Sequence, residues 1–562
     1  MVDLILGQDW LRPVHHLAGR PFGSAPAERC TIVGALARHA RAISDTQFLS
    51  QVGENARTVT YAEACRAVKQ QAAFLVASGL SRGDRVGVIG SNSIAFALAV
   101  LAILEAGGVV VLLSHQDPPA RTVAQVEFAE VRFLLYETTY ASVAEGCTSA
   151  RMIFSFPQLE SSSRQYDAIV SAPPAPTDAA LIFYTSGTTG APKAVVQSHF
   201  AVAQNVWSLT EHHGIAPGTR LLCVLPMHHV NGLEFTVFAA MLGGGHTVID
   251  RGFDGLRFWA TVREHRIEVA SLVPNLLRLL ASRPELRGKE PVPLRYAVSA
   301  AAPLSTGVAQ DAWDRLGLRI VQGYGLSEVT NFSCLMPTDL SLVEHARWMF
   351  GGRRTSIGPP LPNQDVQIHD GSDVAPPGVE GEIVIRGSCV MSGYLHNSAA
   401  TEELFRGGWV HTGDTGYYLP SATGRRYFHV AGRIREIAKR GGVMVSLLEL
   451  DELLAAAPGV ADAGAAAFAN EWVDEEIAAF VVCRPGGTVT KEGIFKHCRS
   501  MLPYSAVPKL IELVTEIPRT PSGKIRRAEI AAHFAPFRQQ LFREDKLAPK
   551  QCQGEKHDSV KR

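Results

Sequence analysis

The amino-acid sequence predicts an α/β protein with a large N-terminal domain of layered α/β subdomains, which includes a distorted β-barrel part, and a small mobile α+β C-terminal domain. Three observations support this class. Runs of Val, Ile and Leu alternate with helix-like segments over much of the first 430 residues. From near Asp365 the sequence consists of short strand-like runs separated by glycines, and a smaller α+β pattern follows Arg433. Apolar strands separated by helices are typical of parallel sheets with helices on their faces.

The individual elements follow from apolar runs and their flanking residues. Buried strands are predicted in the first half at 85–90, 108–113, 130–137 and 151–156, with a helix capped by Ser93 between the first two. Later strand candidates are 220–226, 246–250, 269–274 and 319–325. The C-terminal part predicts a helix at about 447–457, a strand at 476–484 and a helix at 492–502. The apolar stretch 94–113 is interrupted by Glu105 and Gly107-Gly108, so we expect a buried helix and strand rather than a membrane span.

Composition excludes several classes of protein. The chain has 562 residues, of which 46% are hydrophobic. A chain of this length is longer than a single hydrophobic core usually supports, so at least two domains are expected. The 54 basic and 54 acidic side chains balance, so no basic footprint for nucleic acid is present. Nine scattered cysteines without a CxxC pair and a poor signal peptide favour a reducing compartment, and cytoplasmic residence is the default expectation.

The stretch YTSGTTGAPK, from Tyr184 to Lys193, has the residue types of a phosphate-binding loop. Glycines let the backbone approach a ligand closely, hydroxyls and backbone N–H groups donate hydrogen bonds, and the lysine supplies positive charge. A flexible polar turn is the alternative for a bare GTTG. A Walker P-loop requires GxxxxGK[ST], whereas here the lysine stands three residues after Gly190 and Ala194 follows it.

Six further motifs follow in order, and each alone is compatible with an ordinary turn. They are LPMHHVNGLEF (225–235), SAAAPL (299–304), QGYGLSEVT (322–330), WVHTGDTGYY (409–418) with GRIREIAKRGG (432–442), and PRTPSGKIRR (518–527). Together with the loop they resemble the signatures of the adenylate-forming superfamily, which comprises acyl-CoA synthetases, adenylation domains of peptide synthetases, and luciferases. The resemblance spans roughly residues 50 to 530.

The resemblance implies that the chain binds ATP and Mg²⁺. It implies a catalytic set of Lys524, His229 and Glu328, in which Glu328 also holds the metal. An aromatic face for adenine is implied at Tyr324, a hydroxyl for the α-phosphate at Ser327, and ribose contacts at Asp414. The full nucleotide-binding set is Thr185, Ser186, Gly187, Thr188, Thr189, Gly190, Lys193, Ala301, Tyr324, Gly325, Ser327, Asp414 and Arg433.

The resemblance also implies a hinge between two domains that alternate between half-reactions. The expected divisions are an N-terminal domain at 1–431, a hinge at 432–435, a mobile domain at 436–535 and a flexible tail at 536–562. The hinge and second-step residues are Arg435, Lys439, Gly441 and Gly442. An exposed basic linker is the alternative for Arg435, because relatives carry Asp or Lys there.

Substrate-pocket residues are expected at Met227, Val230, Asn231, Ala300 and Gly323. Amino-acid-activating relatives carry an aspartate just after the position of His229, where this chain has Val230 and Asn231, so an acid without an α-amino group is expected. Relatives often have glycine at position 300 and threonine at 327. They also often read GGxNIxPxE where this chain has Met444 and Leu447, and that departure leaves the acceptor open.

These residues predict an acid–thiol ligase that forms an acyl-adenylate and pyrophosphate, then passes the acyl group of a fatty or aromatic acid to CoA. Two alternatives stay open. One is a stand-alone adenylating enzyme that loads a carrier protein or forms an amide, and the other is an inactive nucleotide-binding scaffold. The scaffold is disfavoured because Lys193, Glu328, Asp414 and Lys524 are all present.

Overall fold

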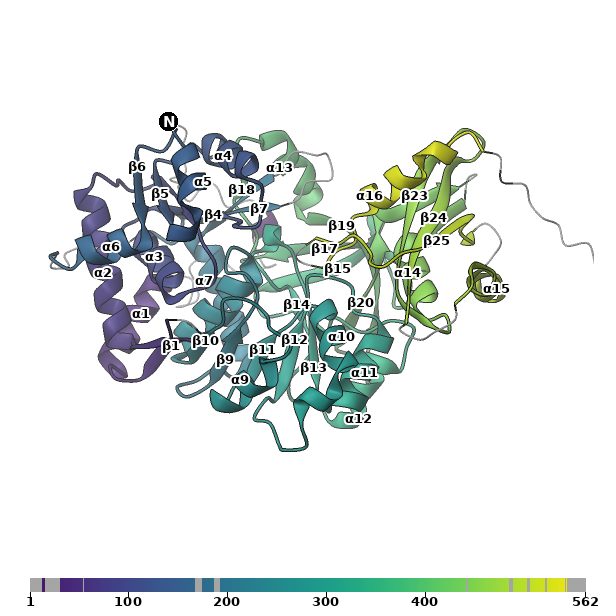
Figure 1. Ribbon diagram of the computed structural model, residues 1–562, viewed down its shortest axis with the longest axis horizontal. Coiled ribbons are helices and arrows are strands. Elements are labelled where there is room, and N and C mark those ends of the chain that lie inside the picture. The colour runs from purple at the N-terminus through teal and green to yellow at the C-terminus, as the bar shows by residue number, and fades with distance from the viewer. Residues whose placement is uncertain are drawn as a thin grey trace, which may run out of the picture. The chain divides into compact units, whose positions relative to one another are not determined.

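The described chain divides into two units, which are drawn in Figure 1. The computed structural model describes residues 13–15, 31–53, 55–166, 174–185, 193–440, 443–484, 489–502, 506–520, 523–540 and 542. Within these ranges, unit 1 is the part that falls in Met1–Arg435 and Pro521–Lys524, and unit 2 is the part that falls in Glu436–Thr520 and Ile525–Arg562. The predicted domain limits, hinge and tail remain predictions, and most of 536–562 lies outside the described residues.

Unit 1 contains a mainly parallel sheet that ends in two antiparallel strands. Its order is β18-β8-β7-β4-β3-β5-β6. Strands β3 to β7 run parallel to one another, β8 pairs antiparallel with β7, and β18 pairs antiparallel with β8. The fully apolar β4 is central and buried, as a parallel strand covered on both faces must be. The strands are β3 (Arg85–Ile89), β4 (Val109–Leu113), β5 (Phe133–Tyr136), β6 (Met152–Ser155), β7 (Ala179–Thr185), β8 (Lys193–Ser198) and β18 (Gly393–Tyr394).

A second sheet of eight strands in unit 1 has the order β14-β13-β12-β11-β9-β10-β1-β2. Its six inner strands are parallel, and the edge strands β2 and β14 are antiparallel. The strands are β1 (Gln47–Gln51), β2 (Arg57–Thr60), β9 (Arg220–Cys223), β10 (His246–Ile249), β11 (Val269–Ser271), β12 (Tyr296–Ser299), β13 (Ile320–Tyr324) and β14 (Cys334–Leu335).

A third sheet closes unit 1 and is antiparallel throughout, with the order β16-β15-β17-β19-β20. Along β15 buried and partly buried residues alternate, which is the period of a sheet with one covered face. The register places Asp414 directly opposite Arg433. The strands are β15 (Gln364–Asp370), β16 (Asp373–Val374), β17 (Gly381–Gly387), β19 (Val410–Pro420) and β20 (Arg426–Arg433).

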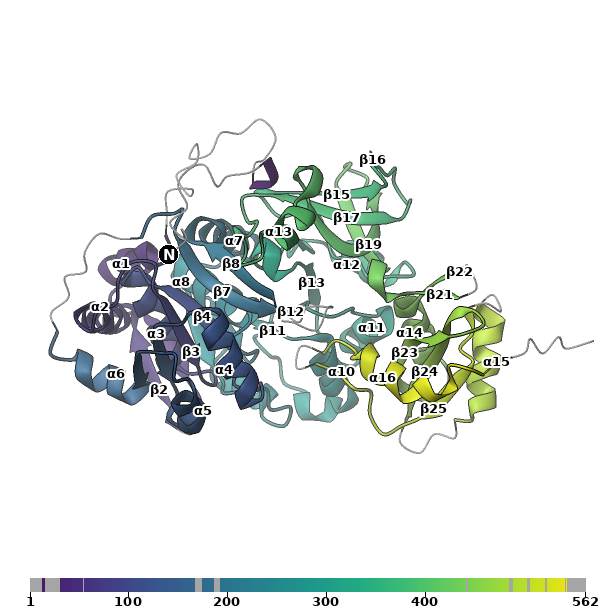
Figure 2. The same ribbon diagram turned by 90° about the horizontal axis from the view of Figure 1, so that it is seen from above.

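Helices join and cover these sheets (Figure 2). In unit 1 they are α1 (Ile32–Ala42), α2 (Tyr61–Ala77), α3 (Ile94–Glu105), α4 (Pro119–Phe128), α5 (Ala141–Gly146), α6 (Phe156–Ser163), α7 (His199–His213), α8 (Ala239–Gly243), α9 (Phe258–Glu264), α10 (Pro274–Ser282), α11 (Thr306–Leu316), α12 (Leu342–Phe350) and α13 (Ser398–Leu404). A π-helix, η5 (Asn231–Phe238), precedes α8. The 3₁₀ turns are η2 (Pro13–His15), η4 (Thr138–Tyr140), η6 (Pro284–Arg287), η7 (Ser327–Val329), η8 (Arg406–Gly408), η9 (Ile434–Glu436) and η11 (Ala535–Phe537).

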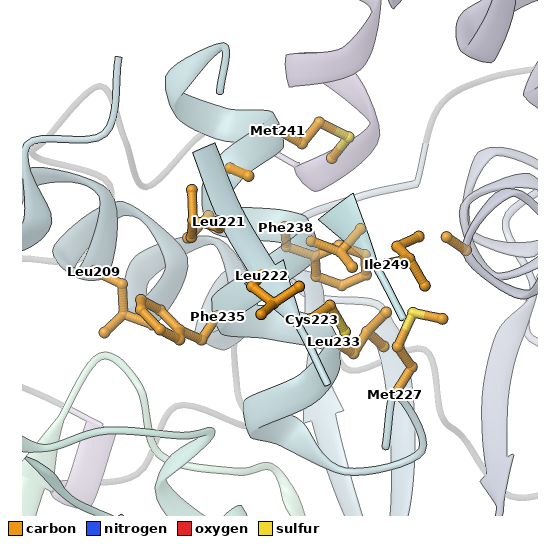
Figure 3. Close-up of a cluster of buried hydrophobic side chains, with 14 of the residues drawn as sticks. Leu209, Leu221, Leu222, Cys223, Met227, Leu233, Phe235, Phe238, Met241 and Ile249 are labelled. Carbon is orange, nitrogen blue, oxygen red and sulfur yellow. The ribbon is translucent and has the colours of Figure 1, made fainter. Parts of the chain in front are cut away.

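The core of unit 1 surrounds the second sheet. Figure 3 shows Leu221 and Leu222 of β9 packed with Phe235 and Phe238 of η5. The apolar segment 94–113 forms buried α3, a turn and buried β4, as its sequence predicts. Among the described residues, no helix is both long and apolar enough to cross a bilayer.

Unit 2 is a smaller α+β body with the sheet order β22-β21-β24-β23, to which β25 adds by pairing with β24. The strands are β21 (Ile437–Arg440), β22 (Val443–Ser446), β23 (Val460–Asn470), β24 (Asp474–Cys483) and β25 (Leu510–Leu513), and the helices are α14 (Leu447–Ala455), α15 (Lys491–Met501) and α16 (Arg527–Phe534). Its apolar residues form two clusters that consist of unit 2 residues alone.

The predicted α/β class, with a large first part and a smaller second part, is confirmed. Several predicted strands, such as 130–137 and 220–226, are longer than the strands of the structure, and two others include residues that begin helices. Phe156 starts α6 behind the capping residue Ser155, whose hydroxyl accepts from the Gln158 amide. Pro274 starts α10, where its missing N–H costs nothing.

Arg527 holds unit 2 together through a buried ion-pair network, which gives a first prediction. Its guanidinium donates to Asp451 (2.7 Å), to Glu436 (3.0 Å) and to the carbonyl of Ala465 (2.6 Å). Arg527→Ala leaves the buried Asp451 carboxylate unpaired, so we expect unit 2 to lose about 3 kcal/mol of stability. Hydrogen exchange over β23 and β24 measures this loss.

The matched control is the neighbouring Arg526, which is exposed and pairs with Glu529 on the surface. Arg526→Ala should change the protection of β23 and β24 by no more than about 1 kcal/mol. Equal effects of the two substitutions would contradict the network.

Candidate active site

The chain turns sharply after β13, and this turn carries three of the predicted site residues, which are Gly325, Ser327 and Glu328. A Cβ at position 325 would lie 1.7 Å from the carbonyl oxygen of Asn331, and one at 323 would lie 2.5 Å from the Phe332 ring. Only glycine permits either approach. Ser327 and Glu328 then begin the 3₁₀ turn η7.

Several hydrogen bonds fix this turn from outside. Nε2 of Gln197, in β8, donates to the carbonyl oxygens of Ser327 and Thr330, at 3.1 Å each. Thr330 has φ of +70° and donates its hydroxyl to the Cys389 carbonyl (2.6 Å). The Met391 amide donates to the Glu328 carbonyl (2.9 Å). A non-glycine residue in this strained conformation persists only where its surroundings hold it.

Glu328 and Lys193 meet at one tyrosine. The Tyr394 hydroxyl donates to Oε1 of Glu328 at 2.8 Å, and Nζ of Lys193 lies 4.7 Å from the centre of the Tyr394 ring. Thr185 and Lys193 are paired across β7 and β8, so they stand at the two ends of the segment 186–192. A cation from strand β8 and a carboxylate from the turn η7 are thus placed together at the predicted phosphate site.

Tyr324, Asp414 and Arg433 form a second group. The Tyr324 hydroxyl donates to Oδ2 of Asp414 (2.7 Å), and Nε of Arg433 donates to Oδ1 (2.8 Å). Burial, together with the Asp414 charge, raises the pKa of Tyr324 well above its usual value, so the hydroxyl stays a donor. The structure therefore brings together three residues that lie on two different sheets.

His229 lies on a loop that two asparagines hold. Asn92 accepts from the Met227 amide (2.8 Å) and donates to the Leu225 carbonyl (2.9 Å), while Asn331 donates to the carbonyl of Val230 (3.3 Å). Burial, together with the positive charges of Lys524 and His115, lowers the pKa of His229 to about 4. The imidazole is therefore neutral near pH 7 and can accept a proton or a hydrogen bond.

Lys524 groups with unit 1, as does Gly523 before it. Gly523, just before it, has φ of +86°, a conformation that favours glycine in a turn. Lys524 is near enough to His229 for its positive charge to lower the pKa of that imidazole.

The predicted substrate-pocket residues have mixed surroundings. Met227 and Ala300 are buried in the main core, and Val230 packs partly against it. Asn231 begins η5, and its Oδ1 accepts from the Ser271 hydroxyl (2.7 Å). These placements do not test whether the residues bind an acid. Ala301 of the nucleotide set is exposed, with a strained φ of +69°.

The remaining predicted residues lie elsewhere or outside the described chain. Lys439 is an exposed residue of β21 in unit 2, and its amide donates to Glu475 (2.6 Å). Nothing is described for the side chain of Arg435. The predicted residues Ser186, Gly187, Thr188, Thr189, Gly190, Gly441 and Gly442 lie outside the described residues.

Sequence analysis missed three residues that shape the site: Asn92, Gln197 and Tyr394. Each acts across a long separation, which is 66 residues between Tyr394 and Glu328 and 130 between Gln197 and Ser327. Asn92 directly precedes the capping residue Ser93, so it could be taken for part of a helix start. No local pattern marks any of them as a site residue, because their partners are set by the tertiary structure.

Comparison with known proteins agrees with this geometry. Residues 36–395 match the model of the AMP-binding enzyme family, and residues 449–524 match the AMP-binding enzyme C-terminal domain. The chain belongs to the AMP-binding enzyme family. The predicted superfamily resemblance is thereby confirmed.

Two curated relatives and one solved structure are among the similar proteins. A sulfoacetate–CoA ligase from Cupriavidus necator is 30% identical over 81% of this chain and 89% of its own length. A feruloyl-CoA synthase from Amycolatopsis is 29% identical over 85% and 94%. The crystal structure of ATP-bound MatB from Rhodopseudomonas palustris superposes with a TM-score of 0.81 at 24% identity, covering 90% of this chain and all of that one. The relatives are CoA ligases, and the predicted enzyme class is confirmed.

The His229 environment gives a second prediction. Its imidazole should remain neutral down to about pH 5, because burial and neighbouring positive groups hold its pKa near 4 instead of the usual value of about 6.5. NMR of histidine-labelled protein measures the titration, and the signal that disappears in His229→Gln identifies the residue. A titration midpoint near 6.5 would show that the ring is well hydrated and charged more easily than this structure implies.

Proposed function

We propose that this protein is an ATP-dependent, AMP-forming acyl- or aryl-CoA ligase. The observation that supports this most is the meeting of Lys193, Tyr394 and Glu328 beside the Tyr324–Asp414–Arg433 group. One group offers a cation and a hard carboxylate oxygen, and the other offers an aromatic hydroxyl, a carboxylate and a guanidinium. Together they match the phosphates and the nucleoside of ATP.

The residues present fit a magnesium nucleotide. The Tyr394 hydroxyl donates to one carboxylate oxygen of Glu328. This hydrogen bond fixes the orientation of the carboxylate and leaves its other oxygen available to a metal ion. Mg²⁺ is usually held by one or two protein carboxylates, with waters and phosphate oxygens as its remaining ligands. Glu328 would hold the metal, whose charge would offset that of the transferring phosphoryl group.

The nucleoside would be held by the second group. Asp414 already accepts from Tyr324 and Arg433, and each carboxylate oxygen has a second lone pair for a ribose hydroxyl. Because Arg433 fixes one oxygen and Tyr324 the other, the carboxylate is oriented before ligand binds. Such preorganisation lowers the entropy that binding would otherwise lose.

The first half-reaction joins the acid to the nucleotide. A carboxylate oxygen of the acid attacks the α-phosphorus of ATP, the bond to the bridging oxygen breaks, and pyrophosphate leaves. Lys193 and Lys524 would stabilise the negative charge on the phosphoryl oxygens, so catalysis rests on positioning and electrostatics. Neutral His229 adds no positive charge and can help position the acid.

The second half-reaction transfers the acyl group to the thiol of CoA. The thiol sulfur bonds to the acyl carbon, AMP leaves with the electron pair of the broken carbon–oxygen bond, and the thiol proton is lost to solvent. We expect unit 2 to rotate about the segment that contains Arg435 between the two steps, so that Lys524 withdraws and the residues around Lys439 take part.

The acid proposed is a fatty or aromatic acid without an α-amino group. Of the expected pocket residues, Met227, Val230, Asn231, Ala300 and Gly323 carry no charge, so they offer no partner for an ammonium group. Ferulate, named in one relative, belongs to this class. Sulfoacetate, named in another relative, carries a sulfonate in addition to its carboxylate. It therefore serves as the comparison for an acid with two anionic groups.

A carrier protein or an amine is the second candidate acceptor, because Met444 and Leu447 depart from the common pattern. Leu447 is the first residue of α14, directly after the cap Ser446, whose hydroxyl accepts from the Glu449 amide (3.3 Å). Proline is favoured at this helix position for its fixed φ, and leucine satisfies the same position. The departure at 447 is therefore explained by helix geometry and does not favour this second candidate over CoA.

Pyrophosphate release over a panel of acids tests the proposed function. Fatty, aromatic and amino acids, with sulfoacetate added, are each supplied with MgATP in the presence and absence of CoA. Release that CoA accelerates with a fatty or aromatic acid supports the proposal. Adenylate formation that CoA leaves unchanged would favour a carrier-loading or amide-forming enzyme, and nucleotide binding without turnover would favour a scaffold.

Separating the two half-reactions gives a third prediction. Lys524→Ala should slow adenylate formation by about 100- to 1,000-fold, the usual loss when one group that stabilises the transition state is removed. Thioester formation from a supplied acyl-adenylate should change little. Lys491→Ala, which removes an exposed lysine at the start of α15, is the control for both steps. Equal loss of both half-reactions in Lys524→Ala would overturn its assignment.

A further inference from the structure

Glu234 is a carboxyl group fully buried in the core of unit 1. It lies within η5, between Leu233 and Phe235, which point into the apolar cluster of Figure 3. The side chain is 0% exposed, and neither carboxyl oxygen has a hydrogen bond of normal geometry to a described residue. An ionised carboxylate in such a place costs far more free energy than one helix residue can offset.

Among the described residues, no positive group compensates for a charge at Glu234. The titratable groups that the neighbouring elements bring to η5 are His213 from α7 and Cys223 from β9, and Cys389 also faces Glu234. Burial lowers the pKa of His213 far below its usual value and raises the pKa of the Cys223 and Cys389 thiols to about 12. All three are neutral near pH 7, and α8 and β11 consist of residues without titratable side chains.

The polar group that does act on Glu234 is the side-chain amide of Gln197, which lowers the pKa of the carboxyl group while burial raises that pKa by more. Both donor hydrogens of this amide are engaged, since Nε2 donates to the carbonyls of Ser327 and Thr330. Its Oε1 is buried and has no donor among the described residues. The amide oxygen therefore has no donor, and the carboxyl group of Glu234 interacts with the same amide.

We propose that Glu234 is a neutral carboxylic acid that donates its proton to Oε1 of Gln197 and thereby fixes the amide in the orientation that holds the Ser327–Thr330 turn. One proton supplies the missing donor and removes the uncompensated charge. An amide turned over by 180° would instead present its oxygen to the two carbonyls and lose both hydrogen bonds. Burial raises the pKa of Glu234 well above its usual value, in keeping with this state.

Glu234 is thus a positioning residue that acts through Gln197. The turn it fixes carries Glu328, whose backbone is held by Met391 and whose carboxylate is held by Tyr394. The part of the proposal that concerns magnesium rests on the proposed function, in which Glu328 holds the metal. The protonation of Glu234 does not depend on that function.

Infrared spectroscopy tests the protonation directly. At pH 7.5 the difference spectrum between the wild-type protein and Glu234→Gln should show the carbonyl-stretch band of one protonated carboxylic acid. The control Glu145→Gln, which alters an exposed glutamate of α5, should show the loss of an ionised carboxylate instead. A carboxylate signature for Glu234 would overturn the proposal.

The same proton makes folding depend on pH with a defined sign. The unfolded chain loses this proton at about pH 4.5 while the folded chain retains it, so stability falls as pH rises between the two pKa values. The folding equilibrium constant of unit 1 should fall about tenfold per pH unit relative to Glu234→Gln above pH 5.5. Denaturation of the two proteins across pH 5.5 to about 7.5 measures this, and parallel curves would contradict it.

Magnesium dependence tests the positioning role. Glu234→Gln keeps a donor for Oε1 of Gln197, so its half-saturating Mg²⁺ concentration should match that of the wild type. Glu234→Leu and Gln197→Leu should each raise that concentration by about tenfold, the value of one buried hydrogen bond, with little change in KM for the acid. An unchanged Mg²⁺ requirement in both leucine variants would overturn the positioning role.

The two proposals can fail separately. If no acid supports turnover but the infrared band is present, the proposed ligase activity fails and the neutral Glu234 stands. If the leucine variants do not fold, magnesium-dependent protection of the Ser327–Thr330 amides in Glu234→Gln and wild type replaces the kinetic test. A difference between those two proteins would then contradict the proposed donor.

Discussion

The site depends above all on how closely the chain folds back on itself after β13. The position of residue 325 beside the Asn331 carbonyl admits no side chain, and that approach directs Tyr324 to one side and Glu328 to the other. Tyr324 reaches Asp414 on the third sheet, and Glu328 reaches Tyr394 beside the first sheet. One turn of backbone thereby joins all three sheets of unit 1.

The chemistry of the site follows from where charges are permitted. Glu328 and Arg433 are paired and partly accessible, and Asp414, although buried, is paired with Arg433, as a site for polyphosphate and metal requires. Deeper in the protein the titratable groups are kept neutral, with lowered imidazole pKa values at His213 and His228 and a raised carboxyl pKa at Glu234. Burial alone accounts for most of these shifts, because few opposite charges lie nearby.

Much of the fold could be predicted because parallel sheets leave a strong pattern. Strands such as β4 and β5 are continuous apolar runs, and α3 follows directly from its cap at Ser93. The strand ends at Ser155 and Ser271 were harder to place, since the apolar run continues into the following helix. There the capping hydroxyl and Pro274 decide where the helix begins, not hydrophobicity.

The sequence by itself determined the α/β class, the order of the motifs and the residues that carry chemistry, because these depend on local residue types and spacing. Only the tertiary structure decided which of those residues meet. Asp414 faces Arg433 through strand register, Glu328 meets Tyr394 across two sheets, and Gln197 reaches a turn 130 residues away. Such pairings depend on the packing of whole sheets, and a linear pattern of residues carries no record of them.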